Sequence, residues 1–82
     1  MTQAEETKVL KNKLKNVNTA GELIEIFNWA YQETLLGNSS RATCFRSVRA
    51  CLPDETRDQP FVDEAERRLE IYYMGRWRWT GD

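Results

Sequence analysis

The groups in this chain that could support acid–base or nucleophilic chemistry are carboxylates and two cysteines, because the sequence contains no histidine. Histidine is the commonest general base near neutral pH. Glu66 and Glu70 lie one helical turn apart, but Arg67 and Arg68 stand between them, which indicates a charged helix surface. No serine lies in a nucleophile-elbow motif, and no glycine-rich loop could hold a phosphate. The sequence therefore predicts a protein that is not an enzyme and has no cofactor.

Cys44 and Cys51 are the other candidates for chemistry, as metal ligands or as a disulfide. Two cysteines without histidine cannot complete a tetrahedral zinc site within one chain, so we expect no metal. Seven residues of helix separate them by roughly 10 Å along the axis, which exceeds the reach of a disulfide. Both fall on the apolar face of a predicted helix, so we expect two buried, reduced thiols.

The elements that position these side chains are helices, since apolar residues recur every three or four positions along most of the chain. The first is predicted over residues 3–16, behind a capping box formed by Thr2 and Glu5. Its apolar stripe is narrow, so we expect residues 1–18 to pack as an N-terminal arm. All the lysines lie in it: Lys8, Lys11, Lys13 and Lys15.

The second helix is predicted over residues 20–36 and has the broadest apolar face, so we expect it at the centre of the fold. Thr19 and Glu22 repeat the capping signature at its start. We expect Gly37 to end it in the left-handed conformation that glycine adopts readily.

The third helix is predicted to start at Ser39 or Ser40 and to stop at Pro53. Its apolar face carries Cys44, Phe45, Val48, Cys51 and Leu52. Residues 53–60 are predicted to form a polar loop.

The fourth helix is predicted to be capped by Asp58, with Pro60 in its first turn and Gly75 at its end. Its apolar face carries Phe61, Val62, Ala65, Leu69, Tyr72 and Tyr73.

These elements predict an all-α fold: one domain over residues 1–82, a small bundle of three to four short helices. Residues 75–82 form an Arg/Trp-rich tail, in which Arg76, Trp77, Arg78 and Trp79 alternate with the period of an extended segment.

Several large apolar side chains do not fit the helical pattern. Trp29 falls on the glutamate face of the second helix with Leu36 two turns below it, and Ile71 and Met74 fall on the polar face of the fourth. Such residues need a partner, either elsewhere in the fold or on another molecule. The tail tryptophans could fold back over Trp29 or be open to a partner, and we favour a partner.

The sequence thus favours a small protein-binding module, a regulator or inhibitor that occupies the surface of another protein or of a second copy of itself. Small accessory proteins of phages and mobile elements often act in this way. The predicted recognition residues are those just described together with the tail: Trp29, Leu36, Ile71, Met74, Arg76, Trp77, Arg78 and Trp79.

The alternative is a small DNA-binding regulator, because the second and third helices and the turn between them resemble a helix-turn-helix in spacing. Arg41, Arg46 and Arg49 would then face the groove of the duplex, unless Arg46 and Arg49 are solvated or pair with the acidic segment 54–58. A net charge of −1 makes nucleic acid the less favoured partner. The sequence contains no apolar run long enough to predict a membrane span, and no signal-peptide core precedes the first helix. We therefore expect a cytoplasmic protein.

Overall fold

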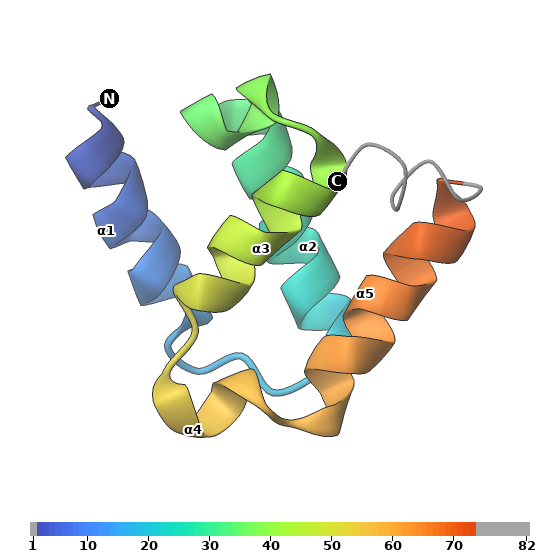
Figure 1. The fold of residues 1–82 in the computed structure, drawn as a ribbon. Coiled ribbons are helices and arrows are strands. Elements are labelled where there is room, and N and C mark those ends of the chain that lie inside the picture. Colours follow the sequence, from blue (N-terminus) through green and yellow to red (C-terminus); the bar gives the residue numbers. More distant parts are fainter. Residues whose placement is uncertain (1, 74–82) are drawn as a thin grey trace.

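α2 (Ala20–Glu33) is the central element of the computed structural model, which describes residues 2–73. It packs against α1 (Gln3–Leu14), α3 (Arg41–Ala50) and α5 (Pro60–Tyr72). In Figure 1, α2 lies behind α3, with α1 on one side and α5 on the other. The predicted all-α class is confirmed, since residues 2–73 contain helices and no strand.

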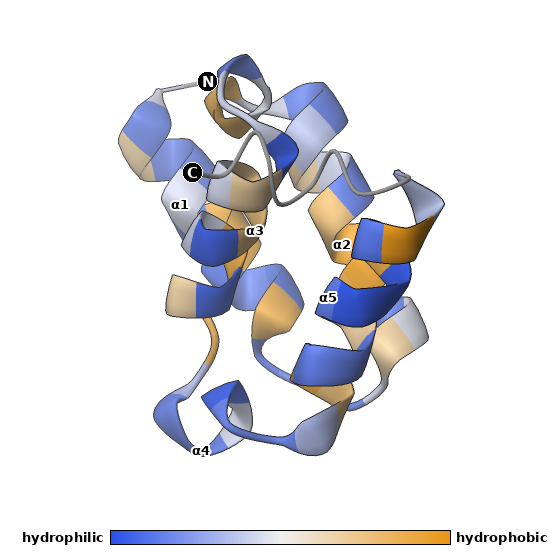
Figure 2. Ribbon diagram, turned by 45° about the vertical axis from the view of Figure 1, so that its right-hand side comes forward, coloured by the Kyte–Doolittle hydropathy of each residue, from blue (hydrophilic) through white to orange (hydrophobic). Residues whose placement is uncertain are grey.

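The core is one cluster of apolar side chains to which all four of these helices contribute. Phe27 of α2 is fully buried, and its ring centroid lies 6.0 Å from that of Phe45 on α3. No polar or charged residue is buried in the described part of the chain. Figure 2 shows this as hydrophobic colour turned inward on α2 and α3 and hydrophilic colour on much of the outer surface. The buried residues are Leu10, Leu14, Val17, Ala20, Leu23, Phe27, Ala30, Ala42, Cys44, Phe45, Val48, Leu52, Val62, Ala65 and Leu69.

Side-chain caps begin the first three helices as predicted. In α1 the Thr2 hydroxyl accepts from the Glu5 amide at 3.2 Å, and the Glu5 carboxylate accepts from the Thr2 amide at 2.9 Å. At α2 the Thr19 hydroxyl accepts from the Glu22 amide at 3.1 Å. Of the two serines considered for α3, Ser40 is the cap. These bonds satisfy amides of the first turn that have no partner within the helix.

The second helix is shorter than predicted, because it ends at Glu33 and not at residue 36. Thr34 leaves the helix with an extended backbone. Its hydroxyl donates to the Ala30 carbonyl at 2.6 Å and accepts from the Leu36 amide at 3.1 Å. Such local side-chain bonds compete with continued helix and end it early.

Gly37 is needed for a different reason than the predicted left-handed turn. It lies in η1, a 3-10 helix over Leu35–Asn38, and a Cβ added to it would stand 2.0 Å from the Tyr31 carbonyl oxygen. The backbone of η1 therefore approaches α2 more closely than any side chain would allow.

Two expectations for the segment before the last long helix are wrong. The predicted loop contains α4, a single helical turn over Asp54–Arg57, in which Arg57 pairs with Asp54 at 3.0 Å. Asp58 ends this turn, and Gln59 precedes α5 without a side-chain cap. Pro60 does occupy the first turn of α5, where its fixed φ angle and missing amide cost little.

Alanine at the two described glycines should have opposite effects. We expect Gly37→Ala to lower the free energy of unfolding by about 1–3 kcal/mol, because the new methyl group forces η1 away from α2. Gly21→Ala in α2 is the matched control. Its Cβ meets nothing within 4 Å, and alanine is the better helix former by about 1 kcal/mol, so it should stabilise. Urea denaturation measures both, and a Gly37→Ala variant as stable as the parent would contradict the close approach.

Candidate protein-binding surface

Two adjacent large side chains at the C-terminal end of α5 lie mostly in solvent. Ile71 is 72% exposed and Tyr72 is 75% exposed, and we call this pair the α5 end. Figure 2 shows hydrophobic colour at this end of α5, whereas the rest of its outer face is hydrophilic. Ile71 thus lies on the solvent side as predicted, and a large exposed apolar pair is a surface that a partner can bury.

The prediction that Tyr72 belongs to the core is wrong. The inward position of that turn is taken by Tyr73, which packs against the core. The ring of Tyr72 lies edge-on to the ring of Tyr73, with centroids 4.8 Å apart and planes at 83°. The Tyr72 ring therefore rests against Tyr73 while most of its surface is exposed.

A groove of about 330 Å³ runs between α2 and α5 and ends at these two tyrosines. The α2–α5 groove has apolar side chains from both helices, and amide side chains from α2 that can form hydrogen bonds with a bound peptide. Its lining residues are Ile24, Asn28, Gln32, Arg68, Leu69, Tyr72 and Tyr73. The groove and the α5 end share Tyr72 and so form one continuous surface.

Trp29 finds its partner within the fold. It is half-buried against the core, and the ammonium nitrogen of Lys13 on α1 lies 4.7 Å from the ring centroid. A cation over an aromatic face is attracted by the ring's electron density. A side chain of α1 therefore contacts the tryptophan that the helical pattern left on a polar face.

The remaining predicted recognition residues are dispersed. Leu36 does not lie below Trp29 on one helix face, because α2 ends before it, and it packs against the core from η1. Met74 and the tail residues Arg76, Trp77, Arg78 and Trp79 lie outside the described residues. Of the predicted set, Ile71 is the described residue with an exposed side chain, and sequence reasoning missed Tyr72 beside it.

The arginines of the helix-turn-helix alternative are largely engaged within the chain. The Arg41 guanidinium lies 4.1 Å from the Tyr73 ring centroid and 5.2 Å from that of Tyr31, so it joins α2, α3 and α5. Arg49 pairs with acids of α5, at 3.3 Å from Asp63 and 3.4 Å from Glu66.

In segment 54–58, Arg49 reaches the carbonyl oxygen of Arg57, at 3.5 Å, and its carboxylate partners lie on α5 instead. Arg46 is exposed. The DNA-binding alternative stays a hypothesis, in which Arg41 and Arg49 would have to give up contacts within the chain.

The cysteines are free thiols, as predicted, but their surroundings differ. Cys44 is fully buried, and this burial raises the pKa of its thiol from 9.0 to about 12 because the thiolate would lose its hydration. Cys51 is only half-buried at the end of α3.

Comparisons with protein-family models, with curated proteins and with solved structures find no match for this chain. Within residues 2–73 no helix is long and apolar enough to cross a membrane, and no cluster of potential metal ligands is present.

The two thiols should differ in reactivity in the folded protein. With an aromatic disulfide reagent at mildly alkaline pH we expect one fast equivalent from Cys51 and a second, from Cys44, only after unfolding. Since unfolding returns the Cys44 pKa to its ordinary value of 9.0, stability should also fall as pH rises above about 9. A Cys44→Ala variant controls the assignment, and fast reaction of Cys44 in the folded chain would contradict its burial.

Removing the Arg41 side chain should loosen the attachment of α5. We expect Arg41→Ala to lower the free energy of unfolding by about 0.5–2 kcal/mol, because the guanidinium bridges Tyr31 and Tyr73. Arg67→Ala is the control, since Arg67 is exposed on α5 and a surface substitution usually changes stability by less than about 0.5 kcal/mol. Equal stabilities of the two variants in urea denaturation would show that the bridge contributes nothing.

Proposed function

We propose that this chain is a small protein-binding module, a regulator or inhibitor that acts by occupying part of a partner's surface. The observation that carries the proposal is the α5 end, where Ile71 and Tyr72 are 72% and 75% exposed side by side. A partner that buries these two side chains removes their apolar area from water, which favours binding.

The free energies expected from burying Ile71 and Tyr72 are large enough for this pair to anchor a partner, and we call the pair the anchor. Burying an isoleucine side chain stabilises a complex by about 1.5–3 kcal/mol, and tyrosine is among the residues most enriched at binding hot spots. The rotamer entropy that Tyr72 loses on binding is reduced in advance, because its ring already rests against Tyr73. The α2–α5 groove beside it adds concave surface with hydrogen-bonding amides at Asn28 and Gln32.

The fold suits an inhibitor that acts by covering part of a partner's surface. The α5 end projects from a helix whose opposite face is fixed in the core by Val62, Ala65 and Leu69. The anchor is therefore presented by a rigid element and needs little ordering when it binds. The partner is another protein or a second copy of this chain.

Substitution of the anchor tests the proposal. We expect Ile71→Asn to keep the melting temperature of the parent, because the side chain is already in water, and to lose the proteins that the parent captures from lysate of its source cells. Arg67→Asn is the matched control, with the same residue introduced one turn earlier on the exposed side of α5. It should capture the same proteins as the parent, as quantified by mass spectrometry. Sedimentation velocity of the two variants and the parent tests binding to a second copy in the same way.

Two results would contradict the proposal. One is a double variant, Ile71→Asn with Tyr72→Ser, that retains every partner and the association state of the parent. The other is capture of nucleic acid alone that collapses as salt rises, since apolar anchoring persists in salt whereas phosphate contacts do not.

A further inference from the structure

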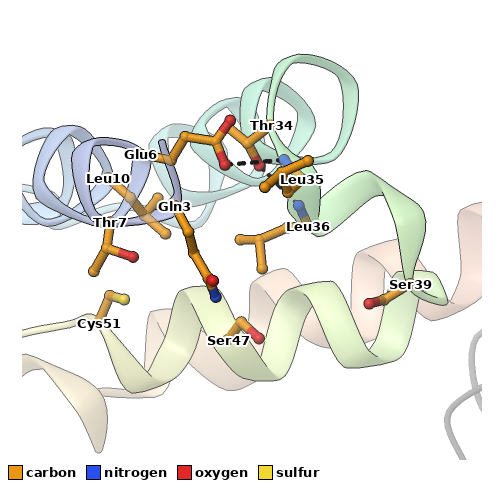
Figure 3. A pocket seen from close by; sticks show the side chains of 10 residues that line it. All are labelled: Gln3, Glu6, Thr7, Leu10, Thr34, Leu35, Leu36, Ser39, Ser47 and Cys51. Carbon is orange, nitrogen blue, oxygen red and sulfur yellow. Dashed lines mark hydrogen bonds between the residues drawn. The ribbon is translucent and has the colours of Figure 1, made fainter. Parts of the chain in front are cut away.

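A second concave site lies between α1, η1 and α3. It has a volume of about 310 Å³ and shares no lining residue with the α2–α5 groove. Figure 3 shows the side chains of Gln3, Leu36 and Ser47 converging on the space between α1 and α3. We call it the α1–α3 cavity, and its lining is Gln3, Glu6, Thr7, Leu10, Thr34, Leu35, Leu36, Ser39, Ser47 and Cys51.

One wall of the cavity is apolar, and the other is polar and includes two side chains without a partner in the described chain. Leu10, Leu35 and Leu36 form the apolar wall, and Leu35 is 53% exposed. The side chains of Gln3 and Ser47 make no hydrogen bond to another residue of the described chain. Hydrogen-bonding groups beside exposed leucine are the features of a site that binds an amphipathic group.

Glu6 is the one charged residue in this lining, and it is held in place. One of its carboxylate oxygens accepts from the Leu35 backbone amide at 3.0 Å, which ties α1 to η1 (Figure 3). The other oxygen makes no hydrogen bond to a residue between 2 and 73. A fixed carboxylate with a free oxygen favours a cationic ligand and disfavours an anionic one.

We infer that the α1–α3 cavity receives an arginine side chain presented by a partner peptide. The aliphatic stem packs on the leucine wall while the guanidinium bonds the free oxygen of Glu6. The acceptors of Gln3 and Ser47 take the remaining donors. Arginine fits better than lysine because its five donors spread over a plane, whereas a lysine ammonium is a compact point charge. This site is separate from the α5 end, so the inference holds or fails independently of the proposed function.

The probe is N-acetyl-arginine amide, titrated into the full chain and followed by backbone amide chemical shifts. We expect millimolar binding, with shifts confined to residues that line the cavity. N-acetyl-citrulline amide has almost the same shape without the charge and should bind at least roughly tenfold more weakly, because the charge-assisted bond is lost. Glu6→Gln should weaken binding of the arginine probe to a similar extent, while its amide oxygen still accepts from Leu35.

Glu25→Gln is the matched control, since it removes the same charge from an exposed position outside the cavity. It should bind the arginine probe as the parent does. Ser47→Ala, which leaves Glu6 in place, should weaken binding measurably and keeps the inference testable if Glu6→Gln does not fold. The inference is overturned by an absence of cavity shifts, by equal binding of the citrulline probe, or by equal binding in the parent and both lining variants.

Discussion

The fold depends on the apolar face of α2, which α1, α3 and α5 all share. Leu23, Phe27 and Ala30 are completely buried there, and the Phe27 ring lies 6.0 Å from the rings of both Phe45 and Tyr31. Truncating one such aromatic typically costs about 3–5 kcal/mol, a large part of the stability of a chain of this size. The other helices are therefore placed by where they meet this one face.

That arrangement determines which surfaces are left for binding. α5 packs along α2 as far as Tyr73, and the guanidinium of Arg41 lies 4.1 Å from the centroid of the Tyr73 ring. With Tyr73 facing inward, Ile71 and Tyr72 lie on the outside of the final turn. On the other side, η1 is drawn against α2 at Gly37 and tied to α1 by Glu6. The α1–α3 cavity lies between these attachments. The positions of the α5 end and of the α1–α3 cavity thus depend on the contacts that attach Tyr73 and η1 to the rest of the fold.

Much of the fold could be predicted from the sequence, because caps and apolar periodicity are local signals. Thr2, Thr19 and Ser40 begin helices as their positions indicate. Errors arose where apolar periodicity does not decide the outcome. Thr34 ends α2 through local bonds of its own hydroxyl, and Tyr73 takes the inward position assigned also to Tyr72. The solvent-facing position of Ile71 was predicted, whereas the contact of Trp29 with Lys13 was not, because Lys13 is distant from it in sequence.

The binding role proposed for the α5 end requires Ile71 and Tyr72 to be open to solvent. Its most direct test is the broadening of NMR signals by a dissolved paramagnetic gadolinium chelate, recorded on dilute full-length protein. If the α5 end is open, the Ile71 methyl and Tyr72 ring signals broaden as strongly as those of Leu35, which is 53% exposed. The signals of buried Val62 then stay sharp. If Ile71 and Tyr72 are instead as protected as Val62 at every dilution, the chain covers its own anchor and the account is wrong.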